Sequence, residues 1–149
     1  QEHYCTAVTQ FTMSQLYPYI FTAVRKDRRM VATSVGGELH EIGIRMVADF
    51  FELNGWDTYY LGANTPAESV VQAVAENGAD LVAISATLTP HVQKVANLVE
   101  TIRTMKRPPR VMVGGYPFNI SQNLWRIVGA DGTAGDARQA VQTGEHLVA

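Results

Sequence analysis

The chain has 149 residues, of which 46% are hydrophobic and 17% are charged, and this balance fits one folded domain with a buried core. Its formal net charge of −2 gives no general attraction to nucleic acid or acidic membranes, and its one cysteine, Cys5, excludes an intrachain disulfide or a cysteine metal cluster. No apolar run approaches the roughly 18 residues of a membrane span, and the cysteine usage fits a cytoplasmic protein.

The first 28 residues differ from the rest of the chain. Residues 2–17 have a helical pattern with Val8, Phe11 and Leu16 on one apolar face, and we expect Pro18 to end or bend this helix. Residues 25–29 form a charged link, which we interpret as a solvated loop. Residues 1–28 are therefore predicted to be the terminal helix of a helical cap module plus its linker, in a piece of a longer protein.

From residue 29 onward, short β-rich apolar runs alternate with helical patterns. The expected strands are residues 30–34, 58–61, 81–85, 111–113 and, weakly, 131–133. The expected helices are residues 41–54, 67–77, 92–105, 120–128 and a last one from 136 to the end. Unbroken hydrophobic strands separated by helices imply a parallel sheet covered on both faces. We therefore predict an α/β fold for residues 29–149, a Rossmann-like (flavodoxin-like), doubly wound sheet of five parallel strands.

The loop after the first expected strand is the first place to look for a ligand, because open parallel sheets bind ligands at the carboxyl ends of their strands. This loop, residues 35–43, has glycines but neither the G-x-G-x-x-G spacing of a dinucleotide site nor a P-loop. It also holds His40, with Glu38 and Glu41 close by. An imidazole oriented by a carboxylate is a good ligand for a transition metal, although a surface His beside Glu explains the same residues.

The spacing between three short motifs favours the interpretation of His40 as a metal ligand. The pattern Glu38-x-His40-x-x-Gly43 is followed by residues 44–84, which are 41 residues, and then by Ser85-Ala86-Thr87. Residues 88–113, which are 26 residues, separate this motif from Gly114-Gly115. These motifs at these intervals resemble the cobalamin-binding domains of the methionine synthase and methylmalonyl-CoA mutase type. The resemblance covers roughly residues 29–149 and implies cobalamin, with its cobalt, as the cofactor.

Carried over residue by residue, the resemblance implies that His40 is the lower axial ligand of cobalt and displaces the cofactor's own dimethylbenzimidazole base. The base and its nucleotide tail would enter a pocket between the sheet and its helices, where Ser85 faces the base. Gly114 and Gly115 would let the tail pass, and Gly43 would lie where the first helix approaches it. The other expected cofactor contacts lie on the same rim: Gly37, Glu38, Leu39, Glu41, Ile42, Asn64, Thr87 and Tyr116.

Two positions depart from the family pattern. Glu38 stands where the family has Asp, so the contact between the carboxylate and His40 could be longer or differently angled. Thr87 replaces Leu and adds a hydroxyl near the base. His91 either pairs with Glu38 or only begins a helix, and the sequence leaves both open. The turn before the next helix also suffices to explain Asn64.

The pair Glu2-His3 opens the first expected helix. In B12-dependent light-sensing regulators, a Glu-His pair belongs to a helical cap over the upper face of the corrin, so the resemblance makes Glu2 and His3 candidate cofactor contacts. An ordinary pair on a helix surface explains the same residues.

The sequence leads us to expect a sensory module, responsive to light or B12. It would hold adenosylcobalamin or methylcobalamin without turnover and act on an output domain or partner protein outside this sequence. The alternative is a corrinoid carrier protein in a methyltransferase system, or the B12 domain of a mutase. We expect no direct contact with nucleic acid or membrane, and the sequence leaves the upper axial ligand and the oligomeric state open.

Overall fold

The computed structural model describes residues 2–20 and 22–149, and the side chains from residue 4 onward within them. Its strands are β1 (Arg29–Val35), β2 (Asp57–Thr65), β3 (Leu81–Ser85), β4 (Arg110–Gly114) and β5 (Gly132–Thr133). All neighbouring pairs are parallel, in the order β2-β1-β3-β4-β5. The chain order reverses between β1 and β3, so the carboxyl ends of these two strands flank the place where such sheets bind ligands.

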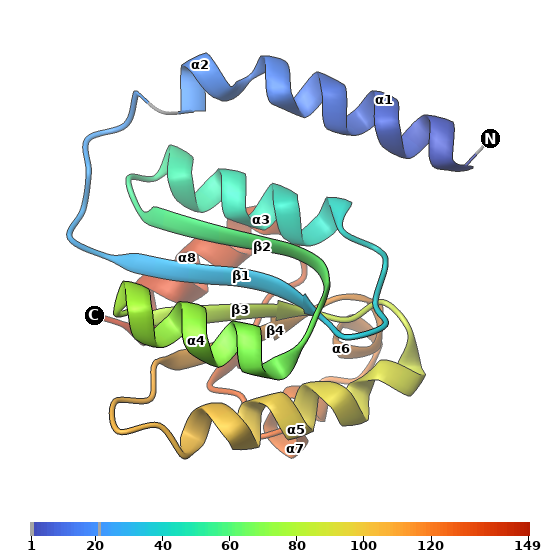
Figure 1. Ribbon diagram of the computed structural model, residues 1–149, viewed down its shortest axis with the longest axis vertical. Coiled ribbons are helices and arrows are strands. Elements are labelled where there is room, and N and C mark those ends of the chain that lie inside the picture. Colours follow the sequence, from blue (N-terminus) through green and yellow to red (C-terminus); the bar gives the residue numbers. More distant parts are fainter. Residues whose placement is uncertain (1, 21) are drawn as a thin grey trace.

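Helices cover both faces of the sheet (Figure 1). The longer ones are α3 (Ile42–Leu53), α4 (Ala67–Asn77), α5 (Val92–Arg103) and α8 (Ala137–Leu147). Shorter turns are the 3-10 helix η1 (Thr89–His91), α6 (Tyr116–Ile120) and α7 (Leu124–Ile127). The prediction of a doubly wound, five-stranded parallel sheet is confirmed.

The core lies in two layers because successive side chains of a strand point to opposite faces. Met30 and Ala32 of β1 pack with α3 and α8 around Phe51 and Trp56, whose rings meet edge to face with centroids 5.0 Å apart. Val31 and Val35 of the same strand face the other layer, against α4 and α5. Each face therefore buries its own apolar cluster, which is why β1 is buried without a break from Met30 to Val35.

The sequence misplaced one helix. Residues 120–128 were expected to form a single helix, but α6 starts at Tyr116 and the chain leaves helical geometry at Ser121 before α7 begins. Pro117 fits the first turn of α6, where no amide donor is needed, and the burial of Pro117 and Phe118 anchors the turn there. The expected helix of residues 2–17 forms α1 (Glu2–Gln15), and Pro18 lies within the separate short turn α2 (Tyr17–Ile20).

Helix α1 lies along the outer side of α3 (Figure 1). The large side chains Tyr4 and Phe11 of α1 are exposed. Its contacts with the rest of the chain include a hydrogen bond that the Gln10 side chain donates to the Glu41 carboxylate. From α2, the Tyr17 hydroxyl accepts hydrogen bonds from Arg45 Nη2 at 2.6 Å and Nε at 3.2 Å. Within residues 2–20 and 22–149, no helix is long and apolar enough to cross a membrane. The domain boundary at residue 28 stays a prediction.

Candidate functional site

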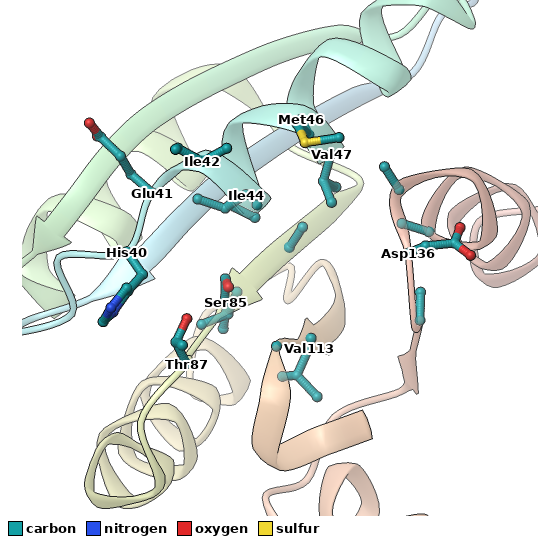
Figure 2. A pocket seen from close by; sticks show the side chains of 18 of the residues that line it. His40, Glu41, Ile42, Ile44, Met46, Val47, Ser85, Thr87, Val113 and Asp136 are labelled. Atoms are coloured by element: carbon teal, nitrogen blue, oxygen red, sulfur yellow. The ribbon is translucent and has the colours of Figure 1, made fainter. Parts of the chain in front are cut away.

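A cavity of about 610 Å³ opens at the carboxyl ends of β1, β3 and β4, between the sheet and helices α3 and α8. We call it the α3/α8 cavity. Figure 2 shows side chains from these elements converging on it, with His40 at one side and Asp136 at the other. Its volume is in the range of small-molecule sites. The lining includes Thr6, residues 39–44, Met46, Val47, 83–85, Thr87, 112–115, Asn119, 134–137 and Ala140.

The loop that carries His40 is fixed by backbone hydrogen bonds to its neighbours. Gly37, at φ +86°, donates its amide to Oδ1 of Asn64 at 2.7 Å, and the Asn64 amide donates to the Glu38 carbonyl at 2.9 Å. Lys94 donates to the Gly36 carbonyl at 2.7 Å. Asn64, itself at φ +52°, therefore braces the loop from the end of β2.

The carboxylate of Glu38 is fully buried and accepts five hydrogen bonds. Oε1 receives His40 Nδ1 at 2.6 Å and the His40 amide at 3.1 Å. Oε2 receives the amides of Thr87 at 2.7 Å and Leu88 at 3.2 Å, and His91 Nδ1 at 2.9 Å. Burial alone would raise the pKa of Glu38, but the hydrogen bonds from His91, His40 and the Thr87 amide outweigh it and lower that pKa to about 2.

An ionised Glu38 fixes the tautomer of both histidines, because a carboxylate without a proton can only accept. Nδ1 of His40 must carry the proton that it donates, so a neutral His40 has its lone pair on Nε2. The His40 side chain is 51% exposed at the mouth of the cavity, and none of the hydrogen bonds of the described residues uses its Nε2. This nitrogen is therefore oriented and open for a metal.

His91 pairs with Glu38, which decides a question that the sequence left open. It ends η1 and begins α5, and its side chain is only 13% exposed. The extra methylene of Glu38, relative to Asp, still allows both imidazoles to reach one carboxylate. One buried carboxylate thus holds two histidines that lie 51 positions apart, since 91 − 40 = 51.

Three glycines at this site differ in how much space a Cβ atom would find there. Gly115, at φ +107°, would place a Cβ 2.1 Å from the Ala86 carbonyl oxygen, so only glycine fits there. A Cβ on Gly114 would lie in ordinary contact, 3.5 Å from the Ala134 carbonyl. A Cβ on Gly43 would meet no atom within 4 Å, although Gly43 lines the cavity. The first turn of α3 therefore leaves unfilled space where a ligand can approach the backbone.

The other expected site residues divide into three groups. Ile42, Ser85 and Thr87 line the cavity, and Thr87 also binds Glu38 through its amide. Leu39 lines the mouth with its side chain 73% exposed, whereas Tyr116 is exposed outside the lining.

Glu41 lines the cavity but directs its carboxylate to Gln10 and to the Tyr60 hydroxyl, which donates to it at 3.2 Å. The side chains of Glu2 and His3 lie outside the described residues.

Sequence reasoning missed the far wall of the cavity. Met112, Asp136 and Ala140 line it from β4 and α8, and Met46 and Val47 line it from α3. The apolar spacing along α3 could have identified Val47, because it recurs on the face that packs on the sheet. Asp136 was readable as a helix start, and its side chain does accept the Gln139 amide at 2.8 Å.

Comparison with known proteins gives one family and several relatives. The family described as "B12 binding domain" matches residues 28–143. Dimethylamine corrinoid protein 2 of Methanosarcina acetivorans is 28% identical over 130 residues, which are 85% of this chain and 59% of that protein. The chain thus spans somewhat more than half the length of this curated relative.

Two solved structures share the fold. The monomethylamine corrinoid protein of Methanosarcina barkeri superposes with a TM-score of 0.76 and 27% identity, over 91% of this chain and 65% of that one. The methanol:cobalamin methyltransferase complex MtaBC of the same organism gives a TM-score of 0.75 over 85% of this chain and 48% of that one. At 19% identity, the second likeness shows the fold alone.

The expectation of a light- or B12-responsive sensor is wrong. The relatives are named as dimethylamine and monomethylamine corrinoid proteins, and these names agree with the alternative of a corrinoid carrier. The Glu2-His3 pair misled the interpretation, because two residues on a helix specify too little.

Proposed function

The chain belongs to the B12 binding domain family, with cobalamin and its cobalt as cofactor, and from this premise we propose that it is a corrinoid carrier domain of a methyl-transfer system, with His40 as the lower axial ligand. The names of the relatives support the carrier, since two of them are corrinoid proteins for methylamines. The domain would itself catalyse no turnover and would serve a methyltransferase partner. A chain of the same fold occurs in a complex named as a methyltransferase.

The observation that carries the proposal is the pairing of Glu38 with His40. The buried, ionised carboxylate holds Nδ1 of His40 at 2.6 Å, which leaves Nε2 at the cavity mouth with its lone pair outward. A ligating histidine commonly donates its other ring nitrogen to a carboxylate, which fixes its orientation and raises its basicity. A surface histidine without a metal would need no such buried partner.

The α3/α8 cavity fits the lower part of a corrinoid. It lies beside His40, has about 610 Å³ of volume, and is open at Gly43, where a Cβ would meet nothing within 4 Å. Ser85 lines it at the end of β3. A base displaced from cobalt by His40 would enter this cavity, with Ser85 available to its free ring nitrogen.

In this proposal each part of the chain has a separate task. His40 would hold the cobalt, and Glu38 holds His40 in the ligating tautomer. His91 and the amides of Thr87 and Leu88 keep Glu38 ionised. The bound cofactor supplies the chemistry, because its cobalt accepts a methyl group and passes it on. The protein then tunes how firmly the lower ligand is held.

The test is to load the chain with cobalamin, desalt it, reduce it and offer methyl iodide. A carrier should retain the corrin and form a methylated product in a ratio of about one per chain, as shown by its absorption spectrum and mass. The methyl group should then pass to a thiol when a thiol-specific corrinoid methyltransferase is added. A chain that releases the corrin on desalting would refute the proposal, and so would a retained corrin that no methyltransferase can demethylate.

A further inference from the structure

The loop that carries His40 begins with a tight turn over residues 35–38. The Glu38 amide donates to the Val35 carbonyl at 2.9 Å, and Gly37, the third residue of the turn, has φ +86°. Both features belong to a type II turn, whose third residue needs a positive φ. The turn sets the direction in which the chain leaves β1, and therefore the place of Glu38 and His40.

The central peptide of this turn joins Gly36 to Gly37 and is held at both ends. Its N–H, from Gly37, donates to Oδ1 of Asn64 at 2.7 Å. Its carbonyl, from Gly36, accepts a hydrogen bond from Nζ of Lys94 at 2.7 Å. Because glycine has no Cβ, two glycines offer little steric resistance to rotation of the peptide between them. The two hydrogen bonds, rather than side-chain packing, therefore keep this peptide in its orientation.

Lys94 reaches the turn from the start of α5, which lies at the edge of the sheet where β1 ends (Figure 1). His91 and Lys94 are three positions apart, so they lie on one face of this first helical turn. His91 donates to the Glu38 carboxylate at 2.9 Å, and Lys94 donates to the Gly36 carbonyl. The start of α5 thus contacts the loop on both sides of Gly37.

We infer that Lys94 is a positioning residue for His40, because it holds the Gly36–Gly37 peptide so that the loop has its ligating conformation before a corrinoid binds. The inference rests on the proposed function. Lys94 acts through the backbone: the peptide directs Glu38, and Glu38 holds Nδ1 of His40 at 2.6 Å. A loop that leaves this conformation for part of the time binds more weakly, in proportion to the fraction of chains that remain competent.

The experiment starts from Lys94→Met, which removes the donor and keeps an unbranched side chain. The loss of one such hydrogen bond shifts an equilibrium about twofold to tenfold. In the unliganded chain, the amides of Gly37 and Glu38 should exchange with D₂O about twofold to tenfold faster, at a nearly unchanged melting temperature. The dissociation constant of cobalamin should rise by a similar factor. Exchange is followed by NMR spectroscopy and affinity by calorimetry, both on the whole chain.

Two further variants serve as controls. Lys94→Arg keeps a charged donor on a long side chain, so it should restore the exchange rates and the affinity to within about twofold of the wild-type values. Lys106→Met removes the same charge from an exposed position in the loop after α5, and should change neither quantity.

The outcomes separate this inference from the proposed function. Unchanged exchange in Lys94→Met would overturn the inference, because the hydrogen bond would then not hold the turn. Faster exchange with unchanged cobalamin affinity would overturn it too, since the turn would not limit ligation by His40. An equal loss of affinity in Lys106→Met would assign the effect to charge alone and also contradict it. If the wild-type chain binds no cobalamin, the proposed function itself fails, whatever the exchange rates are.

Discussion

The buried carboxylate of Glu38 makes a quantitative prediction about stability. Its pKa is lowered from 4.5 to about 2, although burial opposes ionisation, because the hydrogen bonds from His91, His40 and the Thr87 amide favour the charged form. A difference of about 2.5 units corresponds to roughly 3 kcal/mol of preference for the ionised group in the folded state. Glu38→Gln keeps the shape but removes the charge and turns an NH₂ group toward donors. We expect it to lower the free energy of unfolding by about 3 kcal/mol at pH 7.

The pH dependence of this difference tests the cause. A carboxylate whose folded-state pKa is depressed adds stability above its unfolded pKa, and this stability is lost as the pH falls through the folded-state value. The wild-type advantage should therefore be complete at pH 7, begin to fall near pH 4.5 and disappear toward pH 2. By pH 3.5 about 1 kcal/mol of it should be gone.

Urea unfolding, followed by circular dichroism and by the fluorescence of the buried Trp56, measures these free energies at pH 7, 4.5 and 3.5. Glu100→Gln is the matched control, because Glu100 is exposed on α5 and its side chain makes no ion pair or hydrogen bond with the described residues. It should change stability by less than about 0.5 kcal/mol at every pH. A loss for Glu38→Gln that is the same at pH 7 and pH 3.5 would refute the reasoning.

Three further predictions follow from contacts near the site. In urea titrations, His91→Ala should lower the free energy of unfolding by about 1–3 kcal/mol, whereas His91→Gln, which can still donate to Glu38, should lower it by less than about 1 kcal/mol. Equal losses would show that the hydrogen bond is unimportant. Gly115→Ala should lower the free energy of unfolding by at least about 3 kcal/mol, since its Cβ would lie 2.1 Å from a carbonyl oxygen, while Gly43→Ala should leave thermal unfolding nearly unchanged. Similar melting temperatures for the two variants would contradict the backbone geometry. Tyr17→Phe removes the hydroxyl that accepts hydrogen bonds from Arg45, so limited trypsin digestion should release the amino-terminal helices about twofold to fivefold faster, at an unchanged melting temperature. An unchanged release rate would show that this contact does not hold these helices.

The sequence predicted the sheet well because its strands are buried on both faces. The central strands β1 and β3 contain apolar runs of three and four residues and are buried over almost their whole length, and such runs between amphipathic helices allow few other folds. The helix at residues 120–128 was misplaced because the chain around Pro117 is set by the burial of Phe118, which is a tertiary effect. Local patterns do not contain that information.

The site was predictable where it is local and less so where it is built across the fold. Glu38 and His40 are two residues apart on one loop, so their contact could be expected from the sequence. The contact between His91 and Glu38 joins two loops 53 residues apart, and only the packing of η1 against the β1 loop brings it about. The far wall, with Met112 and Asp136, likewise depends on how β4 and α8 meet.

The central claim, that Nε2 of His40 binds the cobalt, is tested most directly by electron paramagnetic resonance of the chain loaded with cob(II)alamin. The account predicts that nitrogen splitting of the cobalt lines changes from triplets to doublets when the protein is labelled with ¹⁵N and the cofactor is not. In His40→Ala this change should be lost. Triplets that persist in the labelled wild-type protein would show that the cofactor's own benzimidazole remains the ligand, and would contradict the account.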